Sequence, residues 1–164
     1  MNDPFLPQGC SASRVLLLVL RVGLIAGTLD IGENLIFNQL RGVTPSMVFH
    51  YIASGLIGSK AFEMGLAAVL LGVVVHYAIA MTWTGVYYAA SRKFTVLIRH
   101  PVISGLFYGI VVYLIMNFLV LPLTGVPHAE KAVTLASRVN GVLALMLCIG
   151  LTIALLLRRD AAAA

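Results

Sequence analysis

Apolar residues fall in four long runs that are separated by shorter, more polar connections. Each run holds roughly 20 or more mostly apolar residues, which is the length that a helix needs to cross a bilayer. The runs are residues 15–37, 66–88, 102–123 and 133–157. Because they are continuous and do not alternate with period two, a membrane β-barrel is not expected. The pattern predicts an all-α polytopic membrane protein in which residues 1–164 form a single transmembrane domain.

The connection between the first two runs contains a further apolar stretch, residues 44–63. Thr44 and Pro45 can begin a helix there, with the threonine as the cap and the proline in the first turn. The stretch is shorter than a span and is interrupted by Gly55 and Gly58. We expect an interfacial helix on the outer leaflet or a re-entrant helix. The alternative is a fifth span, which would put the two termini on opposite sides.

Composition supports a membrane location and excludes other classes. Hydrophobic residues make up 60% of the chain and charged residues only 10%, whereas soluble domains average about 45–50% and about 25%. The net charge of +5 is carried by residues near the span ends, so it does not indicate a nucleic-acid partner. We expect the lipid bilayer as the main partner, and leave open a second copy of the chain or another membrane protein.

Lysine and arginine positions predict the orientation, because cytoplasmic loops carry an excess of both. With four spans, both termini and the loop near residues 92–99 share one side. That side holds Arg14, Arg92, Lys93, Arg99, Arg158 and Arg159, and the other holds Arg41, Lys60, Lys131 and Arg138. We therefore expect both termini in the cytoplasm.

Ionisable residues inside the first run require an explanation, because each costs about 2.5–3.5 kcal/mol to insert. Asp30 and Glu33 lie within about 10 Å of the outer end of this helix. They share one broad helical face with Asn34, and Gly23 and Gly27 continue that face toward the cytoplasm. Arg21 falls on nearly the opposite face, so it is not an intrahelical partner for Asp30.

The other three runs repeat this layout of small residues and polar residues along one face. At matching depth in the outer half of the bilayer, six side chains are expected to meet: Asp30, Glu33, Asn34, His76, Asn117 and Asn140. Small residues let helices approach closely. The residues expected at helix contacts are Gly23, Gly27, Gly72, Gly105, Gly109 and Gly141.

Two interpretations of the polar group stay open. Asparagines in membrane bundles often join helices by hydrogen bonds, and a buried histidine is often only a satisfied core residue. Two carboxylates one turn apart cannot both ionise cheaply at low dielectric. One is therefore expected to hold a proton or to have a cationic partner. The group is thus either a functional acidic site or a structural network.

Motifs for other chemistry are weak or missing. Asp30, Glu33 and His76, with His50 or His128, are the residues that could ligate a metal, but no His-x-x-x-His or Glu-x-x-His spacing exists. The two cysteines, Cys10 and Cys148, form no C-x-x-C pair, and no G-x-S-x-G motif is found. We predict no catalytic residue, metal or cofactor, which leaves an intramembrane enzyme as the weakest alternative.

Four stretches together resemble a group of small bacterial inner-membrane proteins, the YagU-like family. They are residues 21–30 (RVGLIAGTLD), 48–58 (VFHYIASGLIG), 87–92 (YYAASR) and 100–123 (HPVISGLFYGIVVYLIMNFLVLPL). The resemblance implies a location in the bacterial inner membrane and carries over no activity or site residue.

Two functions follow as hypotheses. The first is a small-solute or proton pathway, a transport role that uses the acidic site at Asp30 and Glu33. The second is a non-catalytic accessory or structural membrane protein in which the polar residues only fix helix packing.

Overall fold

The fold is helical throughout the part of the chain that the structure, a computed structural model, describes: residues 12–126 and 134–162. In these ranges no strand is present. Four helices there are long and apolar enough to cross a membrane: Ala12–Gln39, Leu66–Lys93, Pro101–Leu123 and Leu135–Ala161. The prediction of an all-α, multi-pass membrane protein is therefore confirmed.

Each span keeps close to its predicted position. The first is α1 (Ala12–Gln39) and the second is α3 (Leu66–Lys93). Both extend a few residues beyond their apolar runs, because continuing a helix satisfies backbone groups that would otherwise end in lipid. The short α4 (Val96–Arg99) leads into the third span. The predicted start of the fourth run, residue 133, lies outside the described residues.

The third and fourth spans are not α-helical throughout. The third consists of α5 (Pro101–Ile115), the π-helical segment η2 (Met116–Val120) and α6 (Leu121–Leu123). The fourth consists of α7 (Leu135–Ala144), the π-helical segment η3 (Leu145–Leu151) and α8 (Thr152–Ala162). π-Helical turns are rare and are frequently found at functional sites.

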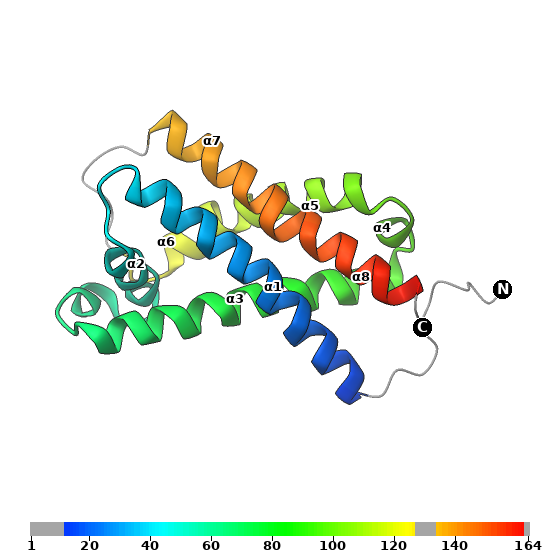
Figure 1. The fold of residues 1–164 in the computed structure, drawn as a ribbon, viewed down its shortest axis with the longest axis horizontal. Helices are drawn as coiled ribbons and strands as arrows, with labels where there is room; N and C mark the ends of the chain where they lie inside the picture. Colours follow the sequence, from blue (N-terminus) through cyan, green and yellow to red (C-terminus); the bar gives the residue numbers. More distant parts are fainter. Residues whose placement is uncertain (1–11, 127–133, 163–164) are drawn as a thin grey trace.

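Two ends of the bundle can be distinguished (Figure 1). The start of α1, the end of α3, α4 and the end of α8 lie together, and we call this the termini end. The other end carries α2 (Pro45–Ile57), α6 and the start of α7, and we call it the α2 end.

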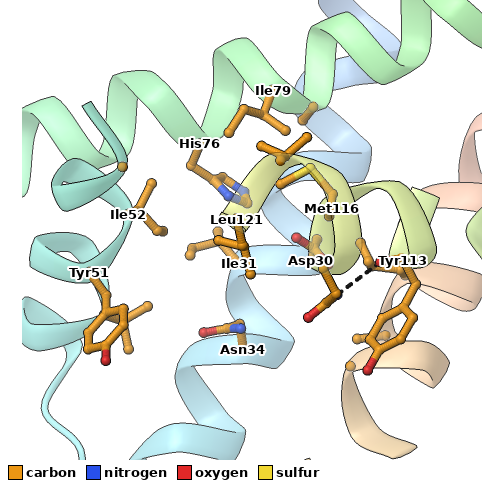
Figure 2. A pocket seen from close by; sticks show the side chains of 18 of the residues that line it. Asp30, Ile31, Asn34, Tyr51, Ile52, His76, Ile79, Tyr113, Met116 and Leu121 are labelled. Carbon is orange, nitrogen blue, oxygen red and sulfur yellow. Dashed lines mark hydrogen bonds between the residues drawn. The ribbon is translucent and has the colours of Figure 1, made fainter. Parts of the chain in front are cut away.

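Helix α2 begins as its sequence predicts. The Thr44 side-chain oxygen accepts a hydrogen bond from the Met47 amide at 3.4 Å, and Pro45 occupies the first turn. Gly58 ends α2 with a φ of 64°, a left-handed conformation that favours glycine, and the 3-10 helix η1 (Gly58–Phe62) follows. With 13 residues, α2 is about 20 Å long, too short for a fifth span. It crosses α3 and does not run alongside it (Figures 1 and 2).

Glycines make the closest helix contacts, and the tightest joins α5 to η3. A Cβ on Gly105 would lie 2.9 Å from the Cα of Leu151, and one on Gly109 would meet the backbone of Met146. Gly150 faces both of these glycines from the fourth span. Their position along the α5–η3 contact means that any side chain there would force the backbones apart.

The other expected packing glycines also touch neighbouring elements. Gly23 faces Met81, Gly27 faces Ala80 and Tyr77, and Gly141 faces the ring of Tyr113. Gly72 differs, because its neighbour is the backbone of Phe49 in α2 and not a spanning helix. This glycine therefore lets the crossing helix α2 lie directly on α3.

The larger of two buried apolar clusters fills the half of the bundle nearest the termini, and the smaller one lies between α2, η1 and α3. The larger cluster, which we call the core, has members from α1, α3, η3 and α8: Val22, Ala26, Ala80, Tyr87, Ile149, Ile153, Ala154 and Leu157. Two tyrosines complete this half. The Tyr108 hydroxyl donates to the Trp83 carbonyl at 2.6 Å, and the Tyr87 hydroxyl donates to the Leu97 carbonyl at 3.1 Å. Arg21 forms an ion pair with Asp160 of α8, a partner that the sequence alone did not identify.

Candidate functional site

A cavity of about 960 Å³ lies in the half of the bundle nearest α2. On the side toward the termini end, the wall reaches as far as Asp30 on α1, Trp83 on α3, Val112 on α5 and Ile149 on η3. Helix α2 supplies a further wall that includes Tyr51. The volume is at the upper end of the roughly 300–1,000 Å³ that small-molecule sites occupy. The cavity therefore has room for a drug-sized molecule.

All six polar residues that the sequence groups together line this one cavity. They are Asp30, Glu33, Asn34, His76, Asn117 and Asn140. Figure 2 shows His76 from α3, Asp30 and Asn34 from α1, and Tyr51 from α2 around the same space. Four spans thus bring their intramembrane polar groups to one place.

Glu33 is held by a neighbouring helix. Its Oε1 accepts a hydrogen bond from Asn140 Nδ2 of α7 at 2.9 Å. Its Oε2 is buried and has no hydrogen-bond partner among the described residues. A buried acceptor without a donor costs roughly 1–3 kcal/mol. Glu33 therefore joins α1 to α7, and half of its carboxyl group is sealed from the cavity.

Asp30 is different, although it lies only one turn away. Its side chain is half-buried and accepts no hydrogen bond from any other described residue. Unlike Glu33 Oε2, neither oxygen of Asp30 is both buried and without a partner. Its titratable neighbours are His76 and Glu33. Of the two carboxyl groups, that of Asp30 is the one a molecule in the cavity can reach.

His76 and the asparagines make mostly local or backbone hydrogen bonds. His76 Nε2 donates to the Gly27 carbonyl at 2.9 Å, which ties α3 to α1. Asn117 Nδ2 donates to the Tyr113 carbonyl of its own span at 2.9 Å, so this bond does not join two helices. Asn34 Oδ1 accepts from Asn38 Nδ2 at 3.0 Å. Of these histidine and asparagine residues, only Asn140 donates a hydrogen bond to a side chain on another span.

Both π-helical segments border the cavity. Met116, Asn117 and Val120 of η2 line it, as do Leu145 and Ile149 of η3. A π-helical turn holds more residues than an α-helical turn, so the faces before and after it are rotated relative to an unbroken α-helix. The two segments therefore decide which side chains of the third and fourth spans point into the cavity.

Several lining residues were not expected from the sequence. Asn38, Tyr51, Thr82 and Arg138 all line the cavity. For Asn38 a signal existed, because it follows Asn34 by one helical turn. Tyr51 had none, because it reaches the cavity only through the docking of α2 on α3.

Metal-ligand chemistry finds little support in the geometry. Among the described residues no group of three His, Cys, Asp or Glu side chains is close enough to hold a metal ion. His50 Nε2 donates to the Gly65 carbonyl at 3.0 Å. His128 lies outside the described residues.

Comparison with models of protein families, with curated proteins and with solved structures finds no match to this chain. The resemblance to the YagU-like family therefore stays a prediction from the sequence.

Proposed function

We propose that this protein binds a small solute in the cavity and passes it across the membrane, with Asp30 as the group that contacts the solute. The observation that carries the proposal is the convergence of six intramembrane polar residues from four spans on one cavity. Such residues are costly in lipid and usually line pathways or cavities. A carboxyl group that is open to the cavity, beside one that is bonded to Asn140, fits a division between contact and support.

A solute is favoured over a proton alone by the size of the cavity. A proton relay needs a chain of titratable groups and a few waters, whereas about 960 Å³ accommodates a molecule of many atoms. Proton movement remains part of the proposal, because Asp30 and Glu33 lie one turn apart in a low-dielectric region. A proton on one of them is the simplest way to lower their mutual repulsion.

The cavity supports a carrier more than an open pore. Its wall stops where the core begins, and Ala80 and Ile149 belong to both. Beyond them, Val22, Ala26 and Tyr87 fill the bundle toward the termini end. A solute that enters near α2 therefore meets a closed core, so passage requires a conformational change.

Asp30→Asn tests this function, because the amide keeps the shape but removes the charge. Purified protein in liposomes that contain a pH-sensitive dye is exposed in turn to cationic, neutral and anionic solutes, and solute-driven proton movement is recorded. We expect Asp30→Asn to abolish the response at unchanged folded yield. Glu63→Gln, at an exposed position outside the cavity wall, is the matched loss of one carboxylate. If folded Asp30→Asn protein responds like the unchanged chain, the proposal is wrong.

A structural role is the second candidate, and two hydrogen bonds favour it. Asn140 joins Glu33 across α7 and α1, and His76 joins the Gly27 carbonyl across α3 and α1. If the polar residues only fix packing, Asp30→Asn and Glu33→Gln should both lower the folded yield, and Asp30 should matter no more than Glu33. The solute pathway predicts instead that Asp30→Asn lowers transport activity more than Glu33→Gln does.

We further propose the bacterial inner membrane as the location, with the termini end in the cytoplasm. The location rests on the family resemblance, and the orientation rests on the density of basic residues near 92–99. Single cysteines placed at Phe94 and at Thr124 would be labelled with an impermeant reagent on intact cells. Only the second should react, and labelling at position 94 from outside would reverse the orientation.

A further inference from the structure

The charge balance of the cavity indicates what kind of solute would fit. Asp30 and Glu33 line it, yet neither forms an ion pair with a described residue, whereas Asp160 is paired with Arg21. Arg138 is the one lysine or arginine among the lining residues that the structure describes. It is exposed and lies about 200° around α7 from Asn140, the residue that bonds Glu33. Neither carboxylate is therefore paired with a lysine or arginine of the wall.

His76 is not a fixed ion-pair partner for these carboxylates either. Its Nε2 hydrogen is used by the Gly27 carbonyl at 2.9 Å. No ion pair between His76 and either carboxylate is found. An uncompensated carboxylate in the membrane is costly, and a cation beside it lowers that cost.

The remaining wall suits an apolar and aromatic body. Trp83 of α3, Tyr113 of α5 and Tyr51 of α2 line the cavity, together with aliphatic residues such as Ile52 and Ile79. Figure 2 shows Tyr51 and Ile52 across the space from Asp30 and Tyr113. Aromatic faces attract cations, most strongly when both are removed from water. A carboxylate with aromatic neighbours is the combination that recognises an organic cation.

We propose that the cavity takes an organic monocation with a bulky apolar body, and that Asp30 is its counter-ion. The inference rests on the proposed function and names the class of solute. It also explains why the acidic residue that can be reached from the cavity is unpaired, since the ligand itself provides the positive charge.

The chain contains a reporter for this binding. Trp83 is its only tryptophan and lines the cavity, so tryptophan fluorescence reports from this wall. Three probes of related shape separate charge from size. They are tetraphenylphosphonium, a cation; tetraphenylborate, an anion; and triphenylphosphine oxide, which is neutral. Each is titrated into full-length protein in nonionic detergent, and the saturable change is fitted after subtraction of detergent without protein.

We expect saturable binding of tetraphenylphosphonium that is weakened about tenfold or more in Asp30→Asn, which corresponds to about 1.4 kcal/mol. Asp30→Glu should recover most of the affinity, which separates loss of charge from misfolding. Glu63→Gln, the same change of charge outside the cavity wall, should bind like the unchanged chain.

Two other results would overturn the inference, and they differ in what they mean for the proposed function. In the first, the anionic or neutral probe binds as tightly as the cation, or Asp30→Asn keeps full affinity for the cation. The cavity then binds solutes without selecting for positive charge, and only the inference is wrong. If none of the three probes gives a saturable Trp83 signal, neither the cation class nor a solute cavity is supported.

Discussion

The two halves of this bundle are built from the same four spans but are packed in opposite ways. Toward the termini end, Gly105, Gly109 and Gly150 bring α5 and η3 into backbone contact, and Tyr87 is fully buried. Toward the α2 end, the same spans separate around about 960 Å³ of space, and their facing residues are polar. Small residues close one half, and side chains with charge or hydrogen-bonding groups line the other.

This difference indicates which half is expected to determine stability and which half is expected to determine activity. A bilayer gives little hydrophobic driving force between helices, so close packing and hydrogen bonds must hold the bundle together. The closed half supplies most of that packing. The open half can therefore carry groups such as Asp30 that do not contribute to packing. Substitutions in the closed half should change folding, and those in the open half should change binding.

The largest effect on stability is expected from Gly150→Leu. A Cβ at this position would meet the carbonyl oxygen of Gly105 and lie 2.7 Å from the amide nitrogen of Gly109, and backbone cannot move aside as a side chain can. We expect a loss at or above the upper end of the roughly 1–3 kcal/mol typical of overpacking. Thermal unfolding in detergent measures it.

Ala144→Leu is the matched control for this prediction, because Ala144 lies on the same span but lines the cavity. Its melting temperature should change little. If Ala144→Leu and Gly150→Leu melt alike, the two halves are not packed differently.

Asn140→Ala should have the next largest effect on stability. It removes the donor to Glu33 Oε1 and leaves both oxygens of that carboxyl group without a partner. We expect a loss of about 1–3 kcal/mol, the usual cost of an unsatisfied buried group. The double variant Asn140→Ala, Glu33→Ala should recover part of it in the same unfolding measurement. If the stability lost in the double variant equals the sum of the losses in the two single variants, the pair is not coupled.

Tyr108→Phe should have a smaller effect in the closed half. It removes the hydroxyl that donates to the Trp83 carbonyl at 2.6 Å but keeps the ring that packs 4.9 Å from Tyr87, centroid to centroid. A loss of about 0.5–1.5 kcal/mol is expected for one hydrogen bond. Binding of the tetraphenylphosphonium probe should persist, whereas its disappearance would show that the closed half shapes the cavity.

Arg21→Gln should have the smallest effect. The Arg21 side chain is 59% exposed, so its ion pair with Asp160 is largely screened by solvent. The melting temperature should fall only slightly, and the difference from the unchanged chain should vanish in high salt. A large, salt-independent loss would place this pair among the main determinants of the closed half.

Helical periodicity was enough to predict the spans and six polar residues of the cavity wall. Asp30, Glu33 and Asn34 share a face because the first span is a regular α-helix, and Gly105 and Gly109 repeat every four residues. Neither the division of roles between Asp30 and Glu33 nor the wall from α2 follows from periodicity. Both depend on contacts between elements that are far apart in the sequence, such as Asn140 with Glu33.

The fourth span shows where periodicity fails. An α-helical stripe through Ser137, Asn140, Gly141 and Ala144 continues to Cys148, yet the structure turns Ile149 toward the cavity. The π-helical segment η3 begins at Leu145 and shifts the register beyond it. The same shift brings Gly150 to the α5 contact, which is why that glycine was not among the predicted packing residues.

The π-helical segments also determine how this protein would respond to insertions and deletions of single residues. A π-helical turn holds about one residue more than an α-helical turn, so deleting one residue within Leu145–Leu151 would let the span return to a regular α-helix with both flanking faces kept. A regular α-helix that kept all of these residues would instead turn Gly150 by about 100° relative to Asn140, and it could not place Asn140 against Glu33 and Gly150 against Gly105 at once. In an alignment of related chains, a one-residue gap here would therefore mark loss of the π-helical turn with the two contacts kept.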